Sequence, residues 1–318
     1  MIKFSNGREI EYFTASGALA FDGRGWPWDR PLIRFGLLKP ELFGVVLKSL
    51  TLQPRIGNLR WWKPWDCVRI LKDGGAVNKV GLTNKGYFWW RHEVAPKLDF
   101  KNKHYIVSLA GKPDEIIAMA LALNDLELAA IEYNPSCPND SQGNQSTAAI
   151  VNMGKRANEV SRHPGIIKLA ANQEYVTITE ELLGFMEAVS FNSLAWKILY
   201  PYRPSPLNSL ERRVGGGGGG VSGKPLQKYN WNAMQDIHNK VPEMPLIASS
   251  IMEYDDLEKA RNMGASAVSF GTIHLPGSPW RPWELFTNPC KPTRIVIRET
   301  QARAQEAFFK SRYEETKR

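Results

Sequence analysis

Residues able to do chemistry are most concentrated in the segment EYNPSCPN, which runs from Glu132 to Asn139. Its cysteine, Cys137, could act as a thiolate or as a proton donor, and Asn134 and Asn139 carry both hydrogen-bond donors and acceptors. Asparagine, proline and serine also favour turns, so the same residues could form an ordinary loop. The residue types indicate a candidate site without choosing between these two interpretations.

A run of six glycines, Gly215–Gly220, is a second candidate. By composition it could be a flexible hinge. Its continuation through Val221-Ser222-Gly223 favours instead a turn after a strand, whose bare backbone N–H groups would suit a phosphate. The histidines and cysteines show no spacing typical of a metal site, so we predict no metal.

Short apolar runs with the composition of β-strands recur along the chain and must position these residues. We predict strands at 11–14, 44–48, 104–109, 129–133, 165–169, 186–191, 245–248 and 265–270. Helical patterns lie between several of them. One begins at Pro113-Asp114-Glu115, and another begins at Asp255-Asp256 and ends at Gly264. Acidic residues at a helix start and glycine at its end match the helix dipole and the preferred C-terminal cap.

Strands about 30 residues apart and separated by helices indicate βαβ units and a parallel sheet. About eight such units in about 250 residues have the size of a (β/α)8 TIM barrel, which is the predicted fold class. A doubly wound sheet is the alternative that periodicity alone leaves open. In a barrel, the segment after the strand at 129–133 lies at the carboxyl ends of the strands, where active sites occur.

Composition limits the class of protein. The chain has 318 residues, 43% of them hydrophobic and 23% charged, which excludes disorder and collagen-like structure. No apolar stretch approaches the roughly 18 residues of a membrane helix, and no secretory signal is visible. The three cysteines, Cys67, Cys137 and Cys290, are too scattered for a disulfide framework and favour the cytoplasm. We predict a single domain over 1–318 with a charged helical tail at about 294–318.

The net charge of +9 suits either nucleic acid or anionic metabolites. Two tryptophan-rich stretches, at 60–66 and 86–92, interleave aromatic and basic residues. Such stretches could stack nucleobases, although tryptophan more often packs in a core or an interface. Charge and aromatic content leave both kinds of partner open.

The segment Glu132–Asn139 resembles the Asn-x-Ser-Cys-Pro-Asn signature of the dihydroorotate dehydrogenase family. Further matches follow the order of the family over about residues 10–275. They are Ala15–Gly17, Val45–Asn58, Asn78–Gly86, Ser108–Gly111, Lys168, Asn192-Ser193, Gly219–Gly223 and Gly271-Thr272. A cysteine rather than a serine at Cys137 is similar to the soluble class of that family.

The resemblance implies an FMN-containing barrel that oxidises (S)-dihydroorotate to orotate in pyrimidine biosynthesis. Cys137 stands at the position of the catalytic base for the C5 proton, and flavin N5 accepts the hydride. A thiol with an ordinary pKa of about 8.5 can act as a base near neutrality after modest tuning. Lys48 would lie against the flavin and the substrate and stabilise the charge of the reduced flavin. By position alone, Lys48 and Lys168 could be surface lysines, but both end apolar strands.

The same resemblance implies two sets of contacts. The substrate set is Lys48, Asn78, Val80, Gly81, Leu82, Asn134, Asn139, Asn192 and Ser193. The FMN set is Ala15, Ser16, Lys48, Ser49, Ser108, Asn134, Lys168, Gly223, Ser249, Ser250, Gly271 and Thr272. The FMN phosphate is expected on the backbone N–H groups of the last five, the usual phosphate position in such barrels.

This chain departs from the family pattern at several places. Ser249-Ser250 replaces a pair of glycines, and serine tolerates positive φ poorly, so phosphate affinity is in question. Val80 replaces a residue that is often methionine, Pro135 stiffens the motif, and 195–213 is unusual enough to reshape the rim of the site.

Alternatives remain. A related flavin barrel could act on another dihydropyrimidine or on dihydrouridine in tRNA, although those tRNA enzymes usually carry Gly-Cys-Pro where this chain has Ser136-Cys137-Pro138. A non-catalytic flavin-binding or RNA-binding relative is the third hypothesis, and binding to nucleic acid is the less favoured outcome. The sequence does not identify the electron acceptor. Fumarate, or NAD through an electron-transfer subunit, fits the soluble class, and the resemblance suggests a homodimer.

Overall fold

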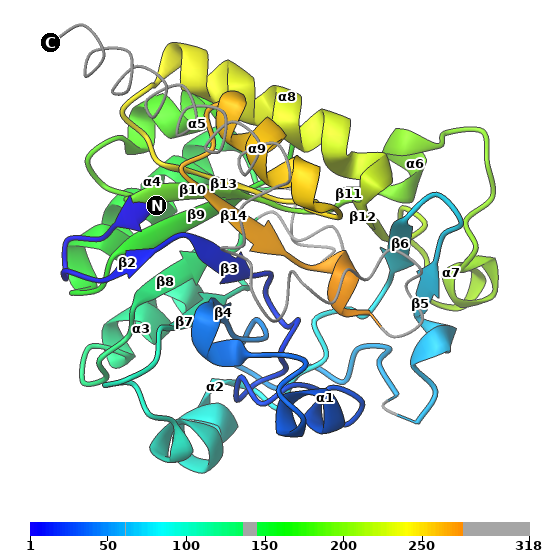
Figure 1. Cartoon of the computed structure of the whole chain (residues 1–318), viewed down its shortest axis with the longest axis horizontal. Helices are drawn as coiled ribbons and strands as arrows, with labels where there is room; N and C mark the ends of the chain where they lie inside the picture. Colours follow the sequence, from blue (N-terminus) through cyan, green and yellow to red (C-terminus); the bar gives the residue numbers. More distant parts are fainter. Residues whose placement is uncertain (61, 136–144, 276–318) are drawn as a thin grey trace, which may run out of the picture.

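The computed structural model describes residues 1–60, 62–135 and 145–275. Parallel strands close into a barrel in the order β10-β13-β14-β3-β4-β7-β8-β9 (Figure 1). Their bounds are β3 (Tyr12–Thr14), β4 (Gly44–Val46), β7 (Tyr105–Leu109), β8 (Ala130–Tyr133), β9 (Gly165–Leu169), β10 (Ala188–Phe191), β13 (Leu246–Ala248) and β14 (Ala267–Phe270). Each barrel strand lies within one of the apolar runs predicted from the sequence, so the TIM barrel is confirmed.

Closure of the sheet rules out the doubly wound alternative. β14 pairs with β3, with Val268 opposite Tyr12, and β10 pairs with β13, with Val189 opposite Leu246. A doubly wound sheet is open and would leave two edge strands unpaired. The strands are buried on both faces, which explains why they are nearly continuous apolar runs.

Helices surround the barrel in the expected alternation. The longer ones are α3 (Pro113–Ala122), α4 (Thr147–Val160), α5 (Tyr175–Leu182), α8 (Lys224–Lys240) and α9 (Tyr254–Asn262). The shorter ones are α1 (Arg30–Arg34), α2 (Tyr87–Trp89), α6 (Trp196–Leu199) and α7 (Asn208–Val214), with a π turn at Trp90–Val94 and 3₁₀ turns at Pro40–Leu42, Pro64–Asp66, Ala95–Lys97 and Thr272–His274. The two helix starts predicted from acidic residues correspond to α3 and α9.

The inside of the barrel is filled at its amino-terminal end. A small hairpin of β1 (Ile2–Lys3) and β2 (Glu9–Ile10) contributes Ile2, Phe4 and Ile10 to a buried cluster. Ala129 and one residue from each barrel strand complete it, and the strand residues are Phe13, Val46, Ile106, Ala130, Ile166, Ala188, Ile247 and Ala267. Because the hairpin closes this end, a ligand site can open only at the carboxyl ends of the strands.

Successive residues of a strand point to opposite faces, so the next interior layer lies two residues further along each strand. It consists of Ala15, Lys48, Ser108, Glu132, Lys168, Ser190, Ser249 and Ser269. The interior thus changes from apolar to mainly polar over one layer. That change marks the floor of a site.

A second sheet covers the opposite end of the barrel from the hairpin (Figure 1). It is antiparallel and consists of β11 (Leu194–Ala195), β12 (Gly220–Gly223), β6 (Gly75–Asn78) and β5 (Val68–Ile70), in that order. Pairing of β6 with β12 brings together segments that are distant in the sequence, with Asn78 opposite Gly220. The unusual segment 195–213 supplies α6 and most of α7 beside this sheet.

The glycine run does not follow a strand, contrary to the expectation from the sequence. It follows α7 and leads into β12, and Gly219 packs so closely on β6 that a Cβ atom there would lie 2.8 Å from the carbonyl oxygen of Asn78. An antiparallel strand of four residues, of which two are glycines, carries no hydrophobic pattern, which explains the error. The predicted tail at about 294–318 lies outside the described residues, so the domain bounds 1–318 stay a prediction. Among the described helices, none is both long and apolar enough to cross a bilayer.

Candidate active site at the carboxyl ends of the barrel strands

A cavity of about 760 Å³ opens where the barrel strands end. Its floor includes Glu132 of β8, Lys168 of β9 and Ser190 of β10, all members of the polar interior layer. Its side wall includes Asn78 and Ser222 from the four-stranded sheet. A cavity with polar side chains on its floor, at the carboxyl ends of barrel strands, is the usual place of catalysis in this architecture.

Most of the residues that the sequence singled out line this one cavity. From the substrate set these are Lys48, Asn78, Val80, Leu82, Asn134, Asn192 and Ser193. From the FMN set they are Ala15, Ser16, Ser49, Lys168, Gly223, Ser249, Ser250, Gly271 and Thr272, in addition to Lys48 and Asn134. The structure therefore brings together residues that are spread over most of the chain.

Four predicted residues differ from this pattern. Ser108 is fully buried and supports a neighbouring serine instead of lining the cavity. Gly81 lies between two lining residues, in a left-handed conformation with φ 70°. Cys137 and Asn139 lie outside the described residues, so their predicted roles rest on the sequence.

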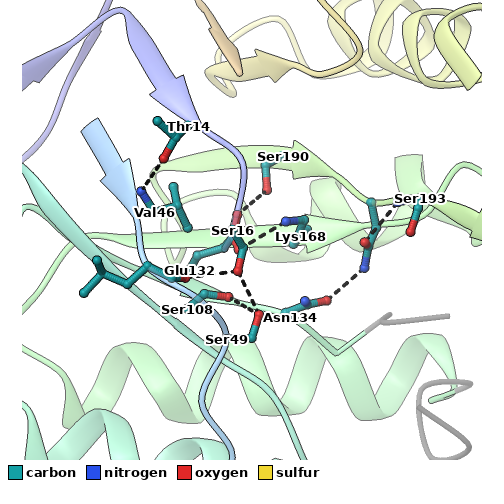
Figure 2. A network of polar contacts seen from close by, with 12 residues as sticks. Thr14, Ser16, Val46, Ser49, Ser108, Glu132, Asn134, Lys168, Ser190 and Ser193 are labelled. Atoms are coloured by element: carbon teal, nitrogen blue, oxygen red, sulfur yellow. Dashed lines mark hydrogen bonds and ion pairs between the residues drawn. The ribbon is translucent and has the colours of Figure 1, made fainter. Parts of the chain in front are cut away.

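Three serines form a chain of hydroxyl groups along one wall (Figure 2). The Oγ atoms of Ser16 and Ser49 are 2.9 Å apart, and those of Ser49 and Ser108 are also 2.9 Å apart. Ser16 also donates to the carbonyl oxygen of Leu47 at 3.1 Å. The chain ties the loop after β3 to the loop after β4, so buried Ser108 holds the two lining serines in place.

Lys48 is positioned by the same two loops. It follows β4, and its backbone N–H donates to the carbonyl of Ala20 at 2.9 Å. Its side chain runs beside Gly17, where a Cβ atom would lie 3.0 Å from Lys48 Cδ. Its Nζ atom is 6.0 Å from the centroid of the Phe21 ring. These contacts direct a cation toward the cavity, where it can stabilise negative charge on a bound ligand.

Two asparagines that follow β8 and β10 bond to each other, and Figure 2 labels the first of them, Asn134. Nδ2 of Asn192 donates to Oδ1 of Asn134 at 2.9 Å, and Oδ1 of Asn192 accepts from the N–H of Ser193 at 3.0 Å. The backbone N–H groups of both asparagines continue the barrel ladders, to Leu109 and Leu169. Both amides are therefore held in fixed orientations at the cavity wall, as recognition of a planar polar ring requires.

A buried ion pair between β8 and β9 was not predicted. Nζ of Lys168 lies 3.2 Å from Oε1 of Glu132, and the side chains are only 10% and 4% exposed. Ser190 donates to Oε2 of Glu132 at 3.3 Å (Figure 2). The three residues occupy the polar layer of neighbouring strands, so strand alternation would have found them. A charged residue inside the buried strand at 130–133 was the available signal.

One end of the cavity has the features of an anion site. Gly223 precedes the long helix α8 with φ 82°, and a Cβ atom there would lie 2.7 Å from the carbonyl oxygen of Gly74. Similarly, a Cβ atom on Gly271 would lie 3.0 Å from the Cβ atom of Ala15. Thr272 donates to Ser222 Oγ at 2.8 Å and joins the end of β14 to β12. Bare backbone and the start of a long helix together favour a phosphate.

Two residues at the cavity wall adopt left-handed backbone conformations that their side chains disfavour. Ser250 has φ 63° and Leu82 has φ 53°. The side chain of Asn84 holds the loop after β6, because its Nδ2 donates to the carbonyl of Leu82 at 2.6 Å and its Oδ1 accepts from Gly86 at 2.8 Å. Such strain is typical of ligand sites, where it is maintained by the surrounding structure.

The described tryptophans of the first tryptophan-rich stretch lie at the rim, and those of the second stretch pack away from the cavity. Trp62 and Trp65 line the cavity and are 61% and 53% exposed. Trp90 is fully buried. Trp26 and Trp28, which the sequence did not single out, also line the cavity and stack with ring centroids 5.7 Å apart.

Cys67 is fully buried and does not line the cavity. Burial raises the pKa of its thiol to about 11, and the nearby Asp66 carboxylate adds to this effect. A thiol of this kind stays protonated and unreactive near neutral pH. It therefore carries none of the chemistry of the site.

Comparison with known proteins gives the same family. The family model described as "Dihydroorotate dehydrogenase" matches residues 36–283. The catalytic subunit of dihydroorotate dehydrogenase B (NAD(+)) from Desulforudis audaxviator is 32% identical over 276 residues, which cover 82% of each chain. The protein of the same name from Petrotoga mobilis is 28% identical over 268 residues, covering 82% of this chain and 83% of that one.

A solved structure confirms the architecture. The chain superposes on the Eimeria tenella protein described as "DHODH in complex with ferulenol" with a TM-score of 0.55. That match has 19% sequence identity and covers 72% of this chain and 69% of the other. At this identity the likeness shows the barrel fold and nothing finer.

Proposed function

Since the chain belongs to the dihydroorotate dehydrogenase family of oxidoreductases, we propose that it oxidises (S)-dihydroorotate to orotate with FMN as cofactor. The observation that supports this most strongly is the single cavity in which Lys48, Asn78, Asn134, Asn192 and the Gly223 anion site meet. The proposal places the reaction in pyrimidine biosynthesis in the cytoplasm, as the resemblance implies.

The described residues fit FMN. Gly223 and Gly271 bring bare backbone to one end of the cavity, where a phosphate would meet the start of α8. Lys48 and Lys168 bring cations to the floor, where a ring system would lie. When bound, FMN supplies the acceptor for the hydride that leaves C6 of the substrate.

Oxidation across a C–C bond also requires a base for the proton at C5. We assign this role to Cys137, which follows β8 three residues after Asn134. Asn134 and Asn192 orient the ring and the carboxylate of the substrate with amide donors and acceptors. Lys48 offers a positive charge at the cavity, and the loop at 80–82, which follows β6 and contains two residues with positive φ, lines the cavity as well.

An anaerobic absorbance titration tests the proposal. Purified protein loaded with FMN should lose its yellow absorbance when dihydroorotate is added, and dihydrouracil should leave it unchanged. The reason is that a site built on hydrogen bonds strongly rejects a ligand that lacks the matching group, here the carboxylate. Protein that takes up no FMN, or FMN that dihydroorotate does not bleach, would contradict the proposal.

The electron acceptor is part of the same proposal. The two relatives described above are catalytic subunits of an NAD(+)-linked enzyme, so an electron-transfer subunit is one expected partner. Fumarate is the other expected acceptor, and a homodimer is the expected assembly. If fumarate alone re-oxidises the bleached protein, fumarate is the acceptor. If fumarate does not re-oxidise it, the electron-transfer subunit is favoured.

A second candidate function has one specific observation in its favour. Trp62 and Trp65 stand half-exposed at the rim together with Arg69, and such residues can stack on a base and contact a phosphate. A flavin barrel acting on another dihydropyrimidine, or on dihydrouridine in tRNA, would use such a rim. Equal bleaching by dihydroorotate and dihydrouracil, or bleaching by tRNA alone, would favour this alternative.

A further inference from the structure

Asn230, on the inner face of α8, is a buried amide that none of the assignments above uses. It is 1% exposed and lines the cavity. Its Nδ2 atom donates to Oγ of Ser249 at 2.7 Å and to the backbone carbonyl of Asn192 at 3.2 Å. Its Oδ1 atom is buried and has no hydrogen-bond partner among the described residues.

The orientation of this amide is fixed by its partners. A backbone carbonyl can only accept a hydrogen bond, so the atom that faces Asn192 O must be the nitrogen. The oxygen must therefore point away from both partners. A buried acceptor without a donor is destabilising. On the same helix face, Leu226 and Met234 are apolar, and an apolar residue at 230 would carry no such penalty.

The two partners of Asn230 locate it within the cavity. Ser249 follows β13, whose neighbour β14 leads into Gly271 of the anion end, whereas Asn192 follows β10, the neighbour of β13 on its other side, and belongs to the amide pair. Asn230 bonds to both and therefore lies between them. In FMN, the group between the phosphate and the ring is the ribityl chain, whose hydroxyl groups are hydrogen-bond donors. The other donor of oxidised FMN, the ring N3–H, lies on the far side of the ring from this chain.

We propose that Oδ1 of Asn230 accepts a hydrogen bond from a ribityl hydroxyl group of FMN. This rests on the proposed function, because it requires that FMN occupies the cavity. The residue then has two roles. Its nitrogen joins the phosphate end to the substrate end, and its oxygen selects a cofactor with a hydroxylated chain.

The test compares two ligands that differ only in that chain. FMN and 7,8-dimethyl-10-(5-phosphopentyl)isoalloxazine share the ring and the phosphate, and the second lacks the chain hydroxyls. Binding to apoprotein is followed by quenching of flavin fluorescence. Asn230→Ala should lower the affinity for FMN by about 2- to 10-fold, which is the effect of losing one hydrogen bond, and it should leave the affinity for the analogue unchanged.

Three variants complete the design. Asn230→Leu fills the same space with an apolar side chain and should show the same selective loss, even if the alanine variant folds poorly. Asn232→Ala, on the exposed side of the same helix, should change neither affinity. Ser249→Ala removes a partner of Asn230 Nδ2 but leaves Asn230 Oδ1 in place, so any loss of affinity should be the same for both ligands.

The outcomes separate this inference from the proposed function. If both Asn230 variants lost affinity for FMN and for the analogue equally, the ribityl contact would be overturned, because Asn230 would then only position its neighbours. Unchanged affinity for both would overturn it as well. Wild-type protein that binds neither ligand would overturn the assignment of FMN, and the ribityl contact with it.

Discussion

Glu132 and Lys168 form an ion pair that is almost completely removed from water, so each depends on the other. Removing one member of such a pair leaves an uncompensated buried charge. We expect Glu132→Ala to lower the free energy of unfolding by about 3–5 kcal/mol, measured by urea denaturation of the apoprotein.

Matched variants of the same cluster make this expectation specific. Ser190→Ala removes only the neutral hydroxyl that donates to Glu132 and should cost about 1 kcal/mol. The double variant Glu132→Leu with Lys168→Met should recover most of the loss, because no charge remains unpaired. If Glu132→Ala were no more destabilising than Ser190→Ala, the pair would not hold the floor of the site.

Cys137 carries the proposed proton transfer. In Cys137→Ala we expect flavin reduction by dihydroorotate to slow by about 10²–10⁴-fold, the usual effect of losing a general base, while FMN binding is retained. Stopped-flow absorbance over a range of pH measures this. Cys137→Ser should recover activity only at high pH, if at all, because a hydroxyl is a much weaker acid than a thiol.

Cys67 is the control for that experiment. Because burial raises the pKa of its thiol to about 11, Cys67 stays protonated up to about pH 10. A rate that rises with pH through the ordinary thiol range near 8.5 therefore cannot come from Cys67. Cys67→Ser should leave the pH profile unchanged. A reduction rate unchanged in Cys137→Ala would remove the assignment of the base.

At the scale of elements, the turn after β13 holds a residue in an unfavourable conformation. Ser250 has φ 63°, where a side chain costs about 1–2 kcal/mol relative to glycine. Ser250→Gly should therefore stabilise the protein by up to about 1 kcal/mol, since the greater flexibility of unfolded glycine offsets part of the gain. FMN affinity should be equal or higher, because the backbone N–H is unchanged.

Ser249 provides the matched comparison, because it does not have a positive φ and accepts a hydrogen bond from Asn230. Ser249→Gly should be destabilising for that reason. Thermal unfolding and fluorescence titration of both variants measure the two effects. Weaker FMN binding in Ser250→Gly than in Ser249→Gly would show that the serine at 250 contacts the cofactor directly.

The barrel strands could be predicted because each is a run of apolar residues buried on both faces, and the structure shortens most of them by one or two residues. The four-stranded sheet could not. Its strands have two to four residues, too few for a period, and β6 pairs with β12, which lies far along the chain. Such pairing depends on tertiary context more than on local propensity.

The site could be predicted to a similar extent. Residues at the ends of barrel strands must converge, which is why Lys48, Asn134 and Asn192 meet. Which of them bond to each other depends on strand neighbours and could not be derived from motifs. The ion pair of Glu132 was missed because attention went to the loop end of its motif, and Asn230 was missed because it lies inside a helix, away from the loops that the motifs mark.

On the scale of the whole molecule, one end of the barrel is filled with apolar side chains and the other end holds the candidate site. At the closed end, Phe4 is 2% exposed and packs edge-to-face on Phe13, with ring centroids 6.5 Å apart. At the open end, Gly223 precedes α8 in a conformation that only glycine adopts easily. The polar layer separates the two ends, so substitutions at one end should not affect the other.

This separation predicts different effects for two variants, one on the free energy of unfolding and the other on FMN affinity. Phe4→Ala should lower the free energy of unfolding of the apoprotein by about 3–5 kcal/mol, because it leaves a cavity in the closed end, while FMN affinity stays unchanged.

Gly223→Ala should weaken FMN binding by more than about tenfold, since its Cβ atom would collide with the carbonyl of Gly74 and displace the backbone that is proposed to meet the phosphate. Urea denaturation and flavin titration of both apoproteins give the four values needed. If Phe4→Ala weakened FMN as strongly as Gly223→Ala, the two ends would be coupled through the polar layer, and stability and binding could not be assigned to separate ends of the barrel.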